Sequence, residues 1–331
     1  PVCCDEIFAG NRPILVTIEP KSLMIIDIQL SDNRKSDVWV EFWQHTKMQG
    51  IDFLSLINDD GLSMQSAKEA FMKDTKRQRD TFHALSHRLG LIKIRFEEAA
   101  YKAIRQAYQA IELLEHAKSE AVETQRKLKY EQAKLQTQKA IELYENFSFL
   151  YNCLLACFEQ FDSKGNLKNV LTVVDDFVCG LCLLKTLNNV YINKQVTTIE
   201  RNLDELFYFY QTAQSIVNEL TNSIDADILR QFCSAWQCHK KMIKAKQTPR
   251  KKALRNKEIQ LLQIVKELLG DDFGNMKNQI YNKLNSIIQS SALVECVNSI
   301  IRPYLNTCKN QPSQELLNLI MFYHNHRRFV A

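Results

Sequence analysis

Glycine and proline are scarce in this chain, with eight glycines and six prolines among 331 residues. Because these two residues form turns and end helices, their scarcity predicts long helices and few tight turns. The sequence also has no run of about 18 apolar residues, so we expect no membrane span. Net charge is only +5, which is a mild indication of an anionic partner.

The ten cysteines occur in a sequence that does not open on a signal-peptide pattern. We therefore expect reduced thiols and a cytoplasmic location. Cys179 and Cys182 have metal-type spacing, but they lie in the apolar run FVCGLCLLKTL, and no second pair has matching spacing. We interpret them as small core residues rather than zinc ligands. The chain begins at Pro1, which favours a fragment of a longer protein.

Residues 1–90 predict a mixed α/β region. Short β-branched segments separated by turn residues indicate strands, and apolar residues at three- and four-residue spacing indicate helices. The expected order is strands at 1–9, 12–18 and 23–30, a helix at 36–48, a strand at 52–58, a helix after Ser63, and a short strand and helix within 77–90. This order is that of a ribonuclease H type of α/β core with a five-stranded mixed sheet and flanking helices.

Residues 91–287 are expected to form an all-helical insertion. Leu91–Phe161 has neither glycine nor proline and is rich in good helix formers, so it predicts either one very long helix or an antiparallel hairpin broken near Ser119–Thr124. Further helices are predicted at 167–187, 197–220, 225–246 and 255–269. Residues 288–331 are then expected to return to the core as its closing helices, which makes the chain helix-rich overall.

Lys240–Lys257, KKMIKAKQTPRKKALRNK, is strongly basic. It has two interpretations of equal weight: a solvated loop between two helices, or a strap that contacts DNA phosphates through residues such as Lys251 and Lys252. No aromatic residue is interleaved with the cations, so stacking on single strands is not indicated.

Three acidic positions suggest chemistry on phosphodiesters. Asp5 and Asp59, with Asp60 as the alternative to Asp59, lie on or just after predicted strands. Glu295 lies in the amphipathic run Ser290–Leu305, which we expect Pro303 to stop. Three carboxylates suit two magnesium ions, which activate a nucleophile and stabilise a leaving oxygen in phosphodiester cleavage.

Four segments resemble DDE-type transposases of bacterial insertion sequences. DEIFAGNRPILVTIEPKSLMI is similar to the first strands of these enzymes, LINDDGLSMQSA to the segment carrying the second carboxylate, and QRDTFHALSHRLG to a segment that closes the sheet. LVECVNSIIRPYL, followed by ELLNLIMFYHNHRRF, looks like the closing helices, and Glu295 with Arg302 matches the family's E-x6-K/R pattern.

The resemblance implies a ribonuclease H-like catalytic domain that cleaves DNA strands at transposon ends and joins them to target DNA. It implies that Asp5, Asp59 and Glu295 hold two Mg²⁺ ions, with Mn²⁺ as a substitute. The expected partners are double-stranded DNA and a second copy of the chain, and no membrane is expected. The expected location is the bacterial cytoplasm, in association with the nucleoid. The expected DNA contacts are Asn298, Arg302, Lys251, Lys252, Arg327 and Arg328.

Two other interpretations stay open at this point. One is a catalytically inactive or fragmentary transposase descendant that keeps the fold and some DNA affinity. The other is a helical interaction scaffold with residues 91–287 as its working part, although the apolar spacing in Leu91–Phe161 drifts from strict heptads.

Overall fold

The computed structural model describes residues 1–329, and the side chains of residues 1–327. It is helix-rich, with 69% of residues in helices, and has a five-stranded mixed sheet. The chain divides into two compact units, which are described separately. The sheet unit comprises residues 1–84, 159–170 and 203–331, and the helical unit comprises residues 85–158 and 171–202.

The sheet has the strand order β3-β2-β1-β4-β5. β1 pairs antiparallel with β2, and β2 with β3, whereas β1–β4 and β4–β5 are parallel. The predicted order of strands and helices in this region is confirmed, with the bounds β1 Val2–Ala9, β2 Arg12–Glu19, β3 Met24–Leu30, α1 Ser36–Met48, β4 Ser55–Asn58, α2 Leu62–Phe71 and β5 Lys76–Arg79.

Two tight turns make the antiparallel meander. Gly10, with φ of 61°, provides the left-handed conformation between β1 and β2, where Ala9 pairs with Arg12. Between β2 and β3, the Glu19 carboxylate accepts hydrogen bonds from the backbone N–H groups of Lys21 (3.0 Å) and Ser22 (2.6 Å). The sequence predicted the second of these turns.

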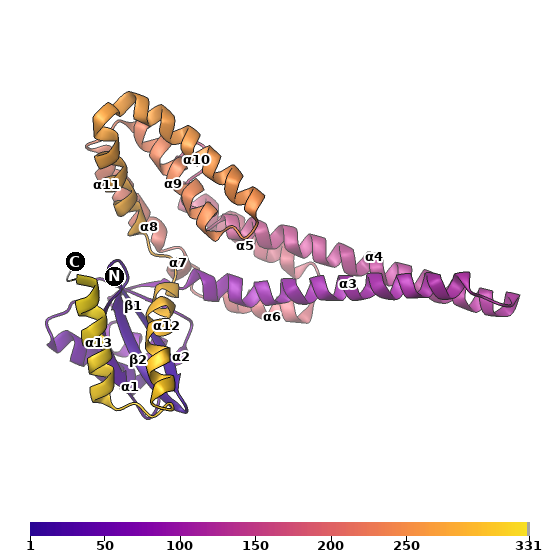
Figure 1. Ribbon diagram of the computed structural model, residues 1–331, viewed down its shortest axis with the longest axis horizontal. Helices are drawn as coiled ribbons and strands as arrows, with labels where there is room; N and C mark the ends of the chain where they lie inside the picture. Colours follow the sequence, from indigo (N-terminus) through magenta and orange to yellow (C-terminus); the bar gives the residue numbers. More distant parts are fainter. Residues whose placement is uncertain (330–331) are drawn as a thin grey trace. The chain divides into compact units, whose positions relative to one another are not determined.

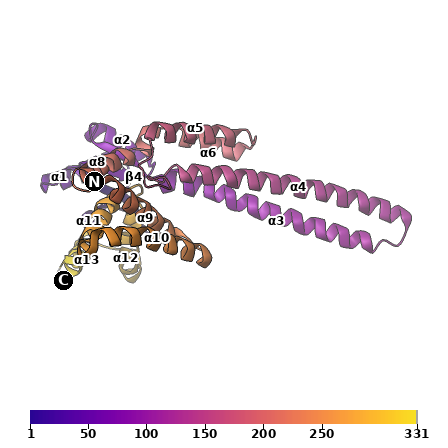
Figure 2. The same cartoon turned by 90° about the horizontal axis from the view of Figure 1, so that it is seen from above.

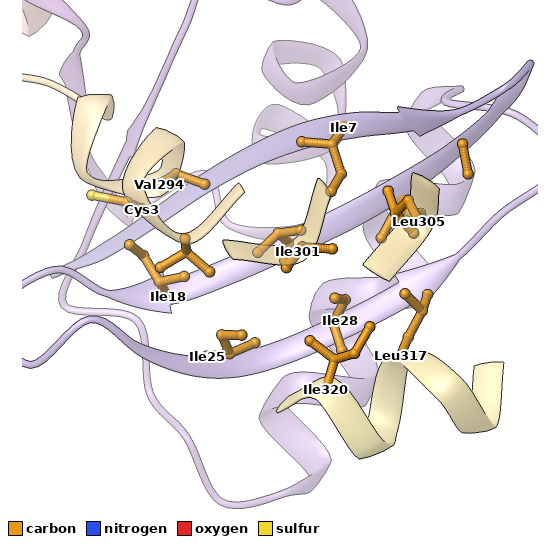
Figure 3. Packing of buried hydrophobic residues seen from close by; sticks show 14 of the residues in the cluster. Cys3, Ile7, Ile18, Ile25, Ile28, Val294, Ile301, Leu305, Leu317 and Ile320 are labelled. Carbon is orange, nitrogen blue, oxygen red and sulfur yellow. The ribbon is translucent and has the colours of Figure 1, made fainter. Parts of the chain in front are cut away.

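One face of the sheet packs against α12 (Ala292–Thr307) and α13 (Gln314–Phe329). Figure 3 shows Val294, Ile301 and Leu305 of α12 over this face, with Leu317 and Ile320 of α13 beside β3. The strands contribute every second residue, such as Cys3 and Ile7 of β1, because side chains of a strand alternate between its faces. Helices from the end of the chain thus complete a core begun at its start.

The other face packs against α1 and α2. Trp39, Phe42 and Trp43 of α1 are fully buried there, together with Cys4 and Leu56 of the sheet. These three aromatic residues share one face of α1, as their helical spacing predicted. The sheet is therefore a middle layer with helices on both faces.

Helix α13 also covers the β3 edge of the sheet. The side-chain amide of Gln314 accepts a hydrogen bond from Leu30 N (2.8 Å) and donates one to Ile28 O (2.8 Å). Asn325 makes the same pair of bonds with the backbone of Ile25, at 3.0 and 2.9 Å. These amides take the place of a neighbouring strand, which keeps the β3 edge from pairing with another chain.

The remaining helices of the sheet unit follow the helical unit in the chain. In this group α9 and α10 lie side by side as an antiparallel hairpin, and α11 packs against α9 (Figure 1). Trp236 of α9 is fully buried and donates a hydrogen bond to Asn285 at 2.8 Å. The bounds are α7 Leu203–Leu206, α8 Phe209–Thr221, α9 Ala226–Lys244, α10 Thr248–Leu269, a 3-10 turn Gly270–Asp272 and α11 Phe273–Asn285.

The helical unit is built on a hairpin of α3 (Arg88–Glu115) and α4 (Glu120–Ala156), preceded by the π-helical turn Phe82–His87. The two helices lie side by side in both views (Figures 1 and 2). The hairpin, rather than one long helix, is the observed alternative, and its break lies at 116–119. Against this pair pack α5 (Val170–Lys185) and α6 (Val190–Ile199), with Gly180 close to Leu154.

Several predictions about helices are wrong. Pro303 does not stop its helix but lies inside α12 on an exposed face, where water can bond the carbonyl left without an N–H partner. The single helix predicted at 197–220 is three shorter segments, α6, α7 and α8. Cys179 and Cys182 are exposed rather than buried, because α5 turns Val173, Phe177 and Leu181 inward.

The predicted domain boundaries after residues 90 and 287 stay a prediction. Compactness groups α7 to α11 with the sheet, and only the helices between 85 and 202 form the helical unit. In the described part of the chain, no helix is long and apolar enough to cross a membrane.

Candidate active site

The parallel pairing of β1 with β4 places Asp5 and Asp59 next to each other. Cys3 pairs with Ile57, so the same register carried two residues further sets Asp5 opposite Asp59, just beyond the end of β4. Neighbouring strands are about 4.8 Å apart, and residues two apart share a face. Both aspartates therefore lie toward the face that carries α12.

Asp60 has a different environment. Its carboxylate accepts hydrogen bonds from Arg79 at 2.6 and 2.7 Å and lies 3.5 Å from Arg77, and both arginine side chains are almost fully buried. Arg77 and Arg79 pair in register with Leu56 and Asn58 and so belong to the face of α1 and α2. Asp60 thus pairs chiefly with Arg79, whereas Arg77 has its closer ion pair with Glu205 at 2.6 Å. This use of the Asp60 carboxylate favours Asp59 as the second carboxylate of the candidate site.

Helix α12 supplies the third acidic residue. Val294, Val297 and Ile301 bury one side of the helix against the sheet. Glu295, next to Val294, is exposed, and Asn298 one turn on is fully buried and donates a hydrogen bond to Asp5 Oδ2 at 3.1 Å. The helix therefore places the amide of Asn298 against Asp5 in the middle of β1, with Glu295 one turn before it.

Electrostatics show that the acidic groups affect one another. Burial first, and then the negative charges of Glu295 and Asp59, raise the pKa of Asp5 to about 7, although the N–H of Glu6 and the nearby His83 act in the opposite direction. Three carboxyl groups that repel one another in this way are stabilised by a cation or by protonation. The site is thus electrostatically unfavourable when fully ionised and alone.

A buried carboxylate fixes the start of α12. Asp80 follows β5 and is 1% exposed, and its Oδ2 accepts hydrogen bonds from Ser291 N (2.7 Å), Ser290 Oγ (3.1 Å) and Ser291 Oγ. Its Oδ1 accepts one from His83 N at 2.9 Å. Ser291 is the residue just before the first turn of α12, where a negative charge is favourable. Asp80 therefore sets the position of the helix that carries Glu295.

Some residues near the site were not predicted from sequence. Arg34, in the loop before α1, forms an ion pair with Glu6 and interacts electrostatically with Asp59. Ser291 lies in the predicted helical run Ser290–Leu305, but the sequence did not indicate its contact with Asp80. Arg34 is distant in the sequence from both Glu6 and Asp59, and it belongs to no recognisable motif. His83 lies near enough to lower the pKa of Asp5.

The predicted DNA contacts divide by burial. Asn298 is buried and donates a hydrogen bond to Asp5, and its predicted contact with DNA stays a prediction. Arg302 is exposed, 3.5 Å from Glu295 on the same helix. Lys251 and Lys252 lie exposed on α10, and Arg327 is exposed on α13. The side chain of Arg328 lies outside the described residues.

The donor set suits a hard divalent cation. Asp5, Asp59 and Glu295 offer carboxylate oxygens, and Asn298 Oδ1 is a buried oxygen without a hydrogen-bond partner in the described structure. No group of three or more His, Cys, Asp or Glu side chains among the described residues is close enough to form a preassembled metal cluster. The residues thus fit magnesium chemically, with side chains that must close around an ion.

No family model, curated protein or solved structure matches this chain.

Proposed function

We propose that this chain is the catalytic part of a DDE-type transposase that cleaves and joins DNA strands with divalent metal ions. The observation that carries the proposal is that Asp5, Asp59 and Glu295, far apart in the sequence, lie near enough for the charges of Glu295 and Asp59 to raise the pKa of Asp5. The order of strands and helices, with three antiparallel strands followed by two parallel ones, supports a ribonuclease H-like core.

The residues have separate roles in this proposal. Asp5, Asp59 and Glu295 would hold the metal, and Asn298 keeps the Asp5 carboxylate in place. When bound, two Mg²⁺ or Mn²⁺ ions supply activation of the attacking water or 3′-hydroxyl and stabilise the leaving oxygen. Arg302 and Arg34 are cations close to these acids, where they would contact DNA phosphates.

A strand-cleavage assay tests the proposal. The full chain, incubated with duplex DNA in Mg²⁺ or Mn²⁺, should nick it, and Ca²⁺ or EDTA should not support nicking. Glu295→Gln should reduce cleavage by at least about 10³-fold. The change removes the negative charge that would bind the metal and, through the metal, stabilise the transition state. Glu295 is exposed, so its replacement should leave the thermal midpoint unchanged.

Wild-type chain that shows no nicking on any duplex, including DNA carrying the transposon ends, would favour an inactive descendant or a helical scaffold. Cleavage that survives Glu295→Gln would remove this residue from the site. A matched control is Glu115→Gln, which makes the same change at an exposed acid of the α3 end and should leave cleavage intact.

A further inference from the structure

The basic segment of the sequence forms the turn end of a helical hairpin. Residues 240–257 contain nine Lys and Arg residues and no Asp or Glu. Helix α9 ends at Lys244 and α10 begins at Thr248, so the cations come from the last turn of one helix and the first two turns of the next. The segment is therefore not a long solvated loop, and we call residues 244–255 the basic hairpin end.

The cations of this hairpin end are exposed and unpaired. Six of them are solvent-exposed, namely Lys244, Lys246, Arg250, Lys251, Lys252 and Arg255. None of these six forms an ion pair among the described residues, whereas Lys241, one turn back on α9, pairs with Glu159 at 2.7 Å. The exposed charges repel one another without a local counterion.

Glu258, the acidic residue that follows these cations in the sequence, does not neutralise them. Glu258 is 7% exposed and turns inward, where it bonds His239 at 3.0 Å and Tyr281 at 3.4 Å. These contacts join α9, α10 and α11 and use the carboxylate for the packing of the hairpin. The net positive charge of the hairpin end is therefore fully available to a partner.

The position of the charges on α10 also favours an anionic partner. Arg250 and Lys251 lie in the first turn and Lys252 directly after it, where the aligned peptide dipoles already produce a partial positive charge. The N-cap residue, Gln247, provides no side-chain cap, and there is no acidic residue in the first turn. A bound anion would relieve both the repulsion among the cations and their repulsion by the helix dipole.

We propose that the basic hairpin end binds the phosphate backbone of duplex DNA without regard to base sequence, as a contact additional to the carboxylate site. Duplex DNA carries one negative charge per about 1.7 Å of axis, so closely spaced, flexible Lys and Arg side chains reach several phosphates at once. Residues 240–257 include no aromatic residue on which bases of a single strand could stack. Ile243 is the one large apolar side chain exposed there, which is too little to insert into a membrane.

Binding of the full chain to a 30-base-pair duplex of arbitrary sequence, followed by fluorescence anisotropy in EDTA, tests this inference. The affinity should fall steeply with NaCl. The double variant Lys251→Glu, Lys252→Glu should bind at least about tenfold more weakly at 0.1 M NaCl. Its plot of log affinity against log salt should be shallower by about 2, because each lost phosphate contact removes about one unit of slope.

Lys127→Glu, Lys129→Glu is the matched control. It makes the same change in net charge at two exposed lysines of α4 and should shift the affinity by no more than about twofold. Equal loss in the two double variants would overturn the proposal, because the effect would then be one of overall charge. Tighter binding to a single strand of equal length, or to anionic phospholipid vesicles, would overturn the choice of duplex DNA.

The assay is independent of catalysis, since it contains no divalent metal. Binding that depends on Lys251 and Lys252 in a chain that never cleaves DNA would leave this inference in place and contradict the proposed function. Cleavage by a chain whose duplex binding does not depend on these two lysines would contradict this inference and leave the proposed function in place.

Discussion

Asn298 Nδ2 donates a hydrogen bond to Asp5 Oδ2 at 3.1 Å and so joins two residues 293 positions apart in the sequence. Asp5 Oδ1 accepts a hydrogen bond from Glu6 N at 2.8 Å, so both carboxylate oxygens are held. Groups that orient a metal-binding carboxylate commonly matter nearly as much as the carboxylate itself. This contact leads to the first prediction.

Asn298→Ala should weaken Mn²⁺ binding by about 10- to 100-fold, because Asp5 loses the donor that orients it. Titration calorimetry of Mn²⁺ into the full chain measures this change directly, without a cleavage assay. Asn306→Ala, the same replacement at an exposed position of the same helix, is the control and should change Mn²⁺ affinity little. Equal affinities of wild type and Asn298→Ala would show that Asn298 only fills space.

Asp59 and Asp60 should respond oppositely to replacement by asparagine. Asp60→Asn removes the charge that pairs with the buried Arg79, and breaking such a pair costs about 3–5 kcal/mol in unfolding free energy. Asp59→Asn keeps the oxygen that accepts from Gly61 N and should cost less than about 1 kcal/mol while abolishing cleavage. Urea unfolding and the nicking assay together measure both effects, and the reverse pattern would assign the second carboxylate to Asp60.

Asp80 and Ser291 should be energetically coupled. In a double-mutant cycle with Asp80→Asn and Ser291→Ala, we expect a coupling energy of about 1–3 kcal/mol in urea unfolding, because one buried carboxylate oxygen accepts from both the N–H and the hydroxyl of Ser291. The single variants should also lower kcat for cleavage more than they raise KM for DNA, since they displace Glu295. Additive stabilities would mean that the contact does not fix α12.

The stability of the metal-free protein should fall as pH rises through the neutral range. The pKa of Asp5 is raised from 3.8 to about 7 in the folded state, chiefly by burial, so between these values the folded state binds more protons than the unfolded state. Unfolding free energy then decreases as pH increases from about 4 to 7 and levels off above, because the ionised carboxylate is disfavoured in the folded protein. Asp5→Asn should remove this decrease.

Urea unfolding of wild type and Asp5→Asn in EDTA at pH 5 and pH 8 measures the effect. The variant should be more stable than wild type at pH 8, by a few kcal/mol at most, with a smaller difference at pH 5. Added Mg²⁺ should restore wild-type stability at pH 8 and leave the variant unchanged. An identical pH dependence of the two proteins would contradict the burial of an ionisable Asp5.

Local patterns in the sequence were sufficient for most elements of the sheet unit. The β-branched segments of β2 and β3, the turn residues between them and the helical apolar spacing of α1 are properties of short segments, and the strands and the helix appear in the structure as expected. Pro303 shows the limit of such reasoning, because packing of Val297, Ile301 and Leu305 on the sheet holds α12 together through the proline. Burial of an apolar face outweighs the loss of one backbone hydrogen bond.

The acidic residues themselves could be named from the sequence, since their types and their places near strand ends are local facts. The choice between Asp59 and Asp60 required the sheet register, because one residue changes the face on which a side chain lies. Likewise, the burial of Asn298, the bonds from Ser290 and Ser291 to Asp80 and the inward turn of Glu258 join positions that are distant along the chain. Sequence determined which chemical groups are available and how each segment coils, whereas only tertiary packing decided which groups meet, because contacts across hundreds of residues are fixed by the shared core and leave no local pattern.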